Sequence, residues 1–534
     1  MTHTVQILVW LLLVIAAVAV VASRLKIPPS ILLVIVGVIL AAFPGLPALH
    51  LEPEMVLLLV LPPVIYDSAV AMSWREFRFN LRPIALLAVG CVVFTTVMVA
   101  TAAHFLLGMP WAVGFVLGAI VSPPDAVAPL SIIRRLQLPH RLVVVLEGEG
   151  LANDATALIL YRFAVIAVSL NTFSLGPAVG SFIAIVICEI AWGIGVGWLM
   201  LRLRRWVKDP QIEITLSVIT PFLAYWPPEH LGGSGVLATV TAGLYISWNG
   251  FRLISAATRL QGIFFWGFLI YLIEGMIFLI TGLQARTLVE RYETVPLTGL
   301  IASAAIICAV VIVTRFVWMY PATYIPRWAS ASLRKRDPPP PWQHPFLLSF
   351  TGVRGIVSLA AALAIPLTTA SGEPFPYRDL ILFLTFSVII VTLVGQGLLL
   401  PVVIRALGLA QTGHRERDED TMEEHFARQQ AIAAALERLE RLGAERNLSD
   451  DVIQPLRIYH RDRLQQAEHR RAGGKEERAL NALHDELELL MIATEREQVN
   501  ELFRDGRVKD EARRRIEREL DLREARVTNH RAEH

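Results

Sequence analysis

The sequence predicts an all-α membrane protein with a separate helical tail, and two observations lead to this prediction. Hydrophobic residues make up 54% of the 534 residues and charged residues only 18%, with a mean hydropathy of +0.53. A soluble globular chain carries about 25% charged residues. The shortage lies in residues 1–410, whereas residues 411–534 are dense in Arg, Glu, Asp and His. We therefore expect a transmembrane domain over residues 1–405 and a cytoplasmic helical tail over residues 406–534.

The apolar runs set the number of transmembrane helices. A spanning helix needs about 20 mostly apolar residues, because the hydrocarbon core is roughly 30 Å thick. About thirteen runs, separated by Pro, Gly and charge clusters, meet this requirement. They are 5–23, 29–44, 54–71, 83–107, 111–131, 142–170, 175–201, 211–227, 233–249, 260–284, 297–324, 344–367 and 380–404. The first run has no preceding basic residue and no small-residue cleavage site, so we expect a retained helix.

Basic residues occur in alternate loops, as they do where a loop faces the cytoplasm. The basic loops carry Arg24 and Lys26; Arg75, Arg78 and Arg82; Arg134, Arg135 and Arg141; Arg202, Arg204, Arg205 and Lys208; Arg252 and Arg259; and Arg327, Arg334, Lys335 and Arg336. With thirteen spans, this alternation predicts an outside N-terminus and a cytoplasmic tail in a multi-pass protein of the cell membrane.

The tail pattern predicts soluble helices at 431–442, 452–466, 476–497 and 510–526, with apolar residues at intervals of three and four between Glu and Arg. A solubilising, dimer-stabilising domain and a regulatory sensor both fit it. Cys91, Cys188 and Cys308 lie in apolar runs, so we expect no disulfide framework or metal cluster. The net charge of +2 argues against a nucleic-acid partner. We expect no cofactor and no enzyme activity.

Ionisable residues stand deep inside the predicted spans, where a charge costs roughly 2.5–3.5 kcal/mol on insertion scales. They are Asp67, Asp125, Glu147, Glu149, Asp154, Arg162, Glu189, Glu274, Arg315 and Arg354. Any one of them can be a structural counter-ion, since buried carboxylates and arginines pair. Arg162 and Arg315 are best interpreted as such counter-ions and Glu189 as part of a structural pair. So large a set still indicates a functional site.

Asp154 is the strongest candidate for that site. It lies about three helical turns inside the basic edge at Arg141. A carboxylate at this depth loses hydration, so either a proton or a hard cation must neutralise it. Hard cations take oxygen ligands, which Asp154, Thr156, Ser122 and the carbonyls of a broken helix can supply. A structural salt bridge from Asp154 to Arg162 or Arg354 remains the alternative.

Two predicted spans contain helix breakers. The fifth contains Ser122-Pro123-Pro124-Asp125 and the twelfth Thr351-Gly352-Val353-Arg354-Gly355. Broken helices at mid-membrane often build the ion sites of secondary transporters. We expect Asp125 near a half-helix N-terminus and Arg354 near a half-helix C-terminus, each opposing the local dipole. The matching positions predict two inverted six-helix repeats, about 5–170 and 211–405, with crossed broken helices; Asp67 and Glu274 also correspond by order.

Together these segments resemble the monovalent cation:proton antiporter family, which includes bacterial sodium/proton antiporters and eukaryotic sodium/proton exchangers. The resemblance covers roughly residues 5–405. The segments that carry it are 61–67 (LPPVIYD), 122–127 (SPPDAV), 146–156 (LEGEGLANDAT), 234–238 (SGVLA), 274–278 (EGMIF) and 352–355 (GVRG).

The resemblance implies a homodimer in which one domain moves like an elevator against a dimerisation domain. Asp154 matches the aspartate that binds the ion and the proton, and Asn153 its neighbour. Electrogenic relatives typically have two aspartates there, so a single one implies one cation for one proton. Glu149 and Arg354 match a buried pair that steadies the core, and Ser122 matches a hydroxyl at the crossing.

Three positions depart from the family pattern. Asp67 stands where a glutamate is usual, and its direct contact with the ion is an open question. Gly150 replaces a common serine, and Asp125 follows two prolines where many members have Thr-Asp-Pro. For Glu274, which faces the third span by order, a core or interface contact is expected.

The leading hypothesis is an electroneutral Na⁺/H⁺ antiporter with Na⁺ bound at Asp154. A K⁺/H⁺ antiporter of the same fold is the first alternative, because the sequence does not fix the geometry that selects the ion. A non-transporting membrane sensor is a second. An intramembrane aspartyl protease, suggested by Tyr66-Asp67, is a third, although the glycine-flanked second aspartate motif of such enzymes is missing.

Overall fold

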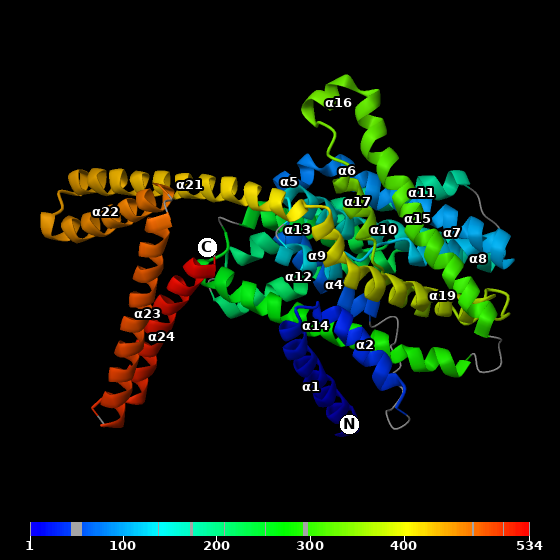
Figure 1. Ribbon diagram of the computed structural model, residues 1–534, viewed down its shortest axis with the longest axis horizontal. Helices are drawn as coiled ribbons and strands as arrows, with labels where there is room; N and C mark the ends of the chain where they lie inside the picture. Colours follow the sequence, from blue (N-terminus) through cyan, green and yellow to red (C-terminus); the bar gives the residue numbers. More distant parts are fainter. Residues whose placement is uncertain are drawn as a thin grey trace. The chain divides into compact units, whose positions relative to one another are not determined.

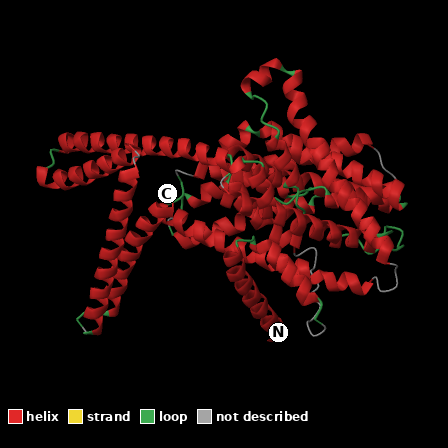
Figure 2. Ribbon diagram, viewed as in Figure 1, coloured by secondary structure: helices red, strands yellow, loops and turns green. Residues whose placement is uncertain are grey.

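The computed structural model describes residues 2–43, 56–136, 138–170, 175–207, 209–250, 253–291, 297–472, 475–505 and 507–532. In these ranges the regular elements are helical, apart from an isolated β-bridge between Thr368 and Pro374 (Figure 2). The predicted all-α class is therefore confirmed. The chain divides into two compact units, Met1–His414 and Arg415–His534.

The helices of the first unit pack into two groups. The first helix group comes from residues 2–71 and 175–291. It contains α1 (Thr2–Leu25), α2 (Pro29–Ala41), the π-helical turn Val56–Val60, α4 (Leu61–Ala71), α11 (Leu175–Arg204), α12 (Pro210–His230), α13 (Val236–Gly250) and α14 (Ala256–Arg291). Within it α2 packs along α14, and α13 packs against α4, α11 and α12 (Figure 1).

The second helix group comes from residues 81–170 and 297–406. It contains α6 (Leu81–Ala85), the π-helical turn Leu86–Cys91, α7 (Val92–Leu107), α8 (Trp111–Val121), α9 (Val127–Leu136), α10 (His140–Leu170), α15 (Leu297–Ala329), α17 (Gln343–Phe350), α18 (Ile356–Leu363), α19 (Arg378–Ile390), the π-helical turn Val391–Gln396 and α20 (Gly397–Ala406). Helices α7, α8, α10 and α15 form its centre. The short helices α5 (Trp74–Phe79) and α16 (Ala331–Arg336) lie in connecting segments.

Long apolar helices coincide with the predicted spans. Six in the described part of the chain are long and apolar enough to cross a membrane: Leu81–Leu107, His140–Ser169, Ala178–Arg204, Ala256–Arg286, Thr298–Ala329 and Arg378–Ala406. Shorter apolar helices are Val9–Leu25, Pro29–Ala41, Leu57–Ala71 and Trp111–Val121. The fifth and twelfth predicted spans are each divided into two short helices, α8 with α9 and α17 with α18, because the predicted breakers interrupt them.

Local sequence signals set several helix ends. Asp209 caps α12, since its Oδ1 accepts hydrogen bonds from the backbone N–H groups of Gln211 and Ile212. Gly108, with a φ of 70°, ends α7 in the left-handed conformation that glycine adopts without steric cost.

The second unit consists of helical hairpins. It contains most of α21 (Leu409–Arg446), then α22 (Asp450–Ala472), α23 (Lys475–Arg504) and α24 (Asp510–Ala532). Each predicted tail helix lies inside one of them. Arg496 pairs with Asp521 and Glu524 across α23 and α24, and Arg457 with Glu440 across α22 and α21. Because these pairs are exposed, each contributes little to stability.

Two glycines let α2 and α14 approach closely. A Cβ on Gly282 would overlap the carbonyl oxygen of Val34 and lie 2.7 Å from the Cα of Gly37. Both neighbours are backbone atoms, so neither can move aside cheaply. The sequence reading did not detect this crossing, because a small residue inside an apolar run gives no sign of its partner.

Substituting Gly282 with Ala should lower the free energy of unfolding by about 1–3 kcal/mol, because the added methyl overpacks the crossing. Gly262→Ala is the matched control on α14, since no atom lies within 4 Å of its Cβ position. Thermal unfolding of the purified protein in detergent measures both variants. Equal melting temperatures for the two would contradict the close crossing.

Candidate ion-binding site

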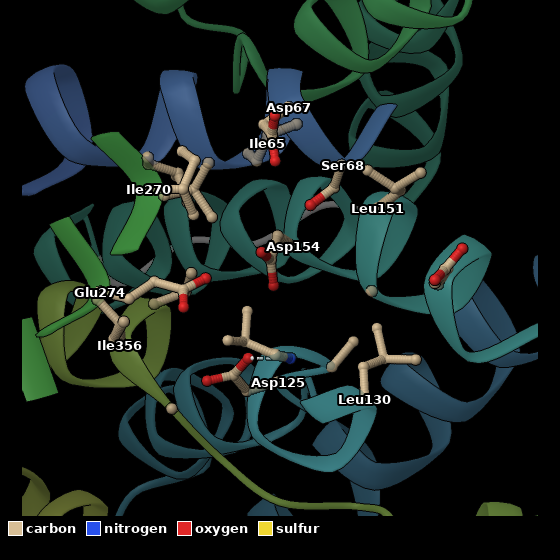
Figure 3. Close-up of a pocket in the computed structure, with 18 of the residues that line it drawn as sticks. Ile65, Asp67, Ser68, Asp125, Leu130, Leu151, Asp154, Ile270, Glu274 and Ile356 are labelled. Atoms are coloured by element: carbon tan, nitrogen blue, oxygen red, sulfur yellow. Dashed lines mark hydrogen bonds between the residues drawn. The ribbon is translucent and has the colours of Figure 1, made fainter. Parts of the chain in front are cut away.

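A cavity of about 410 Å³ lies where the two helix groups meet. It is lined by α4 and α14 of the first group and by α9, α10, α18 and the two helix breaks of the second. Five carboxylates line it: Asp67, Asp125, Glu147, Asp154 and Glu274, of which Figure 3 labels all but Glu147. Asp125, Glu147 and Asp154 come from the second group, and Asp67 and Glu274 from the first. Arg134, also in the lining, pairs with Glu147 at 2.7 Å, and the Arg134 side chain is 65% exposed.

Asp154 lies midway along α10 and points into this cavity (Figure 3). In the part of the chain that the structure describes, its carboxylate makes no ion pair. The two arginines considered as partners are engaged elsewhere: Arg162 pairs with Glu229, and Arg354 bonds backbone carbonyls. The alternative of a structural salt bridge to either arginine is therefore wrong. Asp154 is a deep carboxylate that its neighbours leave available for a cation or a proton.

The two helix breaks meet beside Asp154. The backbone N–H of Asp125 donates to the carbonyl oxygen of Val353 at 2.7 Å, which joins the break between α8 and α9 to the break between α17 and α18. The N–H of Arg354 donates to Thr392 Oγ1 at 2.9 Å, and Thr392 lies in the π-helical turn Val391–Gln396. These bonds satisfy backbone groups that membrane lipid cannot.

Asp125 and Arg354 take the positions that the helix dipoles favour. Asp125 Oδ1 accepts from the N–H of Val127, the first residue of α9, at 2.9 Å. Arg354 Nε donates to the carbonyl of Val121, the last residue of α8, at 2.8 Å, and its Nη1 donates to the Gly352 carbonyl. The negative group thus lies at a helix N-terminus and the positive group at a helix C-terminus.

Gly355 makes room for the Asp125 carboxylate. A Cβ at this position would overlap Oδ2 and the carboxyl carbon of Asp125. The glycine in the break after Arg354 is therefore needed for the close approach of the carboxylate and the crossing backbone, in addition to interrupting the helix.

The buried glutamate pairs with a different arginine from the one expected. Glu149 accepts two hydrogen bonds from Arg315 of α15, at 2.5 and 2.8 Å, and both side chains are at most 2% exposed. The predicted pairing of Glu149 with Arg354 is wrong. Arg315 Nε also donates to the Leu348 carbonyl in α17, so this pair holds three helices of the second group together.

Three further predicted ligands do not line the cavity. Asn153 is fully buried and its Nδ2 donates to the Pro124 carbonyl at 2.7 Å, so it holds α10 to the break. Ser122 Oγ donates to the Ala119 carbonyl, and Thr156 Oγ1 to the Ala152 carbonyl. Both hydroxyls therefore bond to their own helices in this conformation.

Serines that the sequence reading did not single out also line the cavity. Ser68 follows Asp67 on α4, and Ser358 lies in the first turn of α18. Ser358 is 2% exposed, and its hydroxyl has no hydrogen-bond partner in the described residues. The sequence contains one sign that Ser358 lines the cavity. It stands just beyond the 352–355 break, where side chains face the crossing of the two broken helices.

A polytopic helical body with an acid-lined internal cavity at two crossed helix breaks defines the class of a membrane ion transporter. The comparisons with known proteins give the family. Residues 10–406 match the family described as "Sodium/hydrogen exchanger, transmembrane". The chain belongs to this family. It is thus a multi-pass membrane antiporter of monovalent cations and protons, and it is not an enzyme.

Individual relatives agree with this assignment. An uncharacterised Na⁺/H⁺ exchanger of Mycobacterium tuberculosis is 33% identical over 515 residues, which are 95% of this chain and 93% of that protein. A Na⁺/H⁺ antiporter of Aphanothece halophytica is 31% identical over 418 residues, covering 78% and 75%. The sodium proton antiporter MjNhaP1 from Methanocaldococcus jannaschii superposes with a TM-score of 0.61 at 18% identity, over 77% of this chain and 99% of that one, and shares the fold.

Removing the Glu149 carboxylate should destabilise the second helix group strongly. Glu149→Gln leaves the buried Arg315 charge unbalanced, and breaking a buried pair in this way costs about 3–5 kcal/mol. Glu147→Gln is the matched control: its partner is exposed, so the loss should stay below about 1 kcal/mol. Thermal unfolding compares them. A Glu149→Gln protein as stable as Glu147→Gln would rule out the pair as a major support.

Proposed function

We propose that this protein exchanges Na⁺ for H⁺ across the cell membrane, with the two competing for Asp154. The observation that carries the proposal is the Asp154 carboxylate, which lines the cavity beside two crossed helix breaks and has no ion-pair partner in the described chain. A bare carboxylate at such depth is unfavourable. Either ion neutralises it, and both together would overcompensate it. Binding one therefore releases the other.

We further propose a one-to-one, electroneutral exchange. Next to Asp154 along α10 stands Asn153, whose amide carries no exchangeable charge and is already bonded to the Pro124 carbonyl. Asp125 is committed to the N-terminus of α9. Glu147 is paired with Arg134, and Glu149 with Arg315. That leaves Asp154 as the cavity carboxylate of the second helix group that can alternate between the proton and the cation. Asp67 and Glu274 face it from the first group, and Asp67 is the proposed additional oxygen ligand.

Alternating access supplies the transport step. We propose that the second helix group carries Asp154 past the first group as an elevator, in a homodimer of thirteen-span protomers built as two inverted repeats. Support comes from the packing: the helices of each group contact one another more extensively than they contact the other group. Exposed apolar residues on α14, among them Ile263 and Phe264, offer a surface for a second protomer or for lipid. The basic loops orient the tail to the cytoplasm.

Asp154→Asn should abolish sodium-driven proton movement in proteoliposomes, because an amide neither releases a proton nor balances a cation. The assay follows an internal pH dye after a Na⁺ gradient is imposed. Asp209→Asn is the control, since asparagine caps a helix as well as aspartate does. Full exchange by the Asp154→Asn protein would disprove the assignment.

A K⁺/H⁺ antiporter is the second candidate. One observation favours it: a relative from Bacillus pumilus, 32% identical over 71% of this chain and 58% of that protein, is named a sodium, potassium, lithium and rubidium/H⁺ antiporter. Cavity size and ligand geometry select among such ions.

Proteoliposomes driven in turn by Na⁺, Li⁺ and K⁺ separate these candidates. We expect the highest exchange rate with Na⁺ and no change in a potential-sensitive dye, because each cycle moves no net charge. Faster exchange with K⁺ would establish the second candidate. A membrane potential generated during exchange would contradict the one-to-one stoichiometry.

A further inference from the structure

Among the described residues, the lining of the cavity along α10 ends at Asp154. On α10 its lining includes Glu147, Gly150, Leu151 and Asp154, and no later residue of that helix. The next turns of α10 carry Leu158 and Tyr161, which are 6% and 8% exposed. Both belong to an apolar cluster that also contains Tyr225 of α12 and residues of α13. The side of the protein beyond Asp154 is therefore sealed by packed side chains.

An ion pair joins the two helix groups on this sealed side. Arg162 of α10 donates from Nη2 to Glu229 Oε1 near the end of α12. The side chains are 29% and 19% exposed, so the pair lies at the rim of the apolar seal. Arg162 follows Asp154 by eight residues, about 12 Å along the same helix. Any movement of α10 that carries Asp154 also carries Arg162.

The Glu229 side of the pair is fixed within the first helix group. Glu189 of α11, only 2% exposed, accepts hydrogen bonds from the backbone N–H groups of Ser234, Gly235 and Leu237 at 2.6, 3.2 and 3.1 Å. These bonds cap the start of α13 and anchor the turn that follows Glu229. The N–H of Gly233 donates back to the Pro228 carbonyl at 2.8 Å, which ties the turn to the end of α12.

We propose that the Arg162–Glu229 ion pair is the gate that holds the outer side closed while the cavity is open to the cytoplasm. This inference rests on the alternating access proposed above. For Asp154 to reach the outer side, α10 must move against the anchored end of α12, and the ion pair must break. Arg162 and Glu229 are thus positioning residues that set the balance between the two access states. They do not contact the ion.

A pair of cysteine reporters tests this assignment. In a protein whose three native cysteines are replaced by alanine, Leu158→Cys places a thiol beneath the gate, and Ser68→Cys places one in the cavity. A membrane-impermeant thiol reagent is added from outside to cells carrying the first reporter and to inside-out vesicles carrying the second. The labelling rate measures how often each side opens, and it requires no transported ion.

Arg162→Gln or Glu229→Gln should raise labelling of the Leu158 position from outside about fivefold, the effect expected from a lost half-buried ion pair. Labelling of the Ser68 position should fall at the same time, because the two access states exclude each other. The charge-swapped double variant, Arg162→Glu with Glu229→Arg, should restore both rates. A variant that is merely misfolded would label faster at both positions.

Arg82→Gln is the matched control. Arg82 pairs with Asp337 at 2.7 Å, with side-chain exposures of 29% and 13%. This pair lies within the second helix group, because Asp337 also pairs with Arg141 of α10 and Arg327 of α15. Its loss should leave both labelling rates unchanged. Unchanged labelling in both gate variants, with normal Na⁺/H⁺ exchange, would overturn the gate alone. Whether ion exchange depends on Asp154 is measured separately, by the sodium-driven proton movement of the Asp154→Asn protein.

Discussion

The structure depends on how the polar backbone at two broken helices is satisfied inside a membrane. Where α8 and α17 end, carbonyl groups lose their helical partners, and lipid offers none. The protein supplies two buried arginines instead: Arg354 reaches the end of α8, and Arg315 reaches α17. Glu149 balances Arg315, and the dipole of α8 favours Arg354. Without these groups the breaks would be too costly to bury, and Asp154 would have no polar crossing beside it.

Much of the architecture was predictable because short stretches of sequence determine it. Apolar runs predicted the helices of the first unit, and charge-rich periodicity predicted those of the tail. Pro123, Pro124 and the 352–355 glycines predicted the two breaks, since these residues act on the backbone wherever they stand. The opposite dipole roles of Asp125 and Arg354 followed from the sign of each charge and its place beside a break.

Pairings between distant residues were not predictable in the same way. The depth of Asp154 below Arg141 and the family resemblance singled out Asp154 and Glu149, but neither could tell which of two buried arginines faces Glu149. Only the position of α15 in the centre of the second group brings Arg315 to Glu149. Likewise, Ser122 and Thr156 are chemically suitable ligands whose hydroxyls bond to their own helices, whereas Ser68 and Ser358 line the cavity without a motif to indicate it.

The size of the cavity has a consequence for ion selection. A volume of about 410 Å³ can hold on the order of ten water molecules. A cation inside the cavity therefore has room to keep water molecules around it. Dehydration is deferred until the ion meets Asp154 and the oxygens near the crossing. Under the proposed exchange, discrimination among alkali ions then depends on how well a handful of oxygens beside Asp154 replaces water.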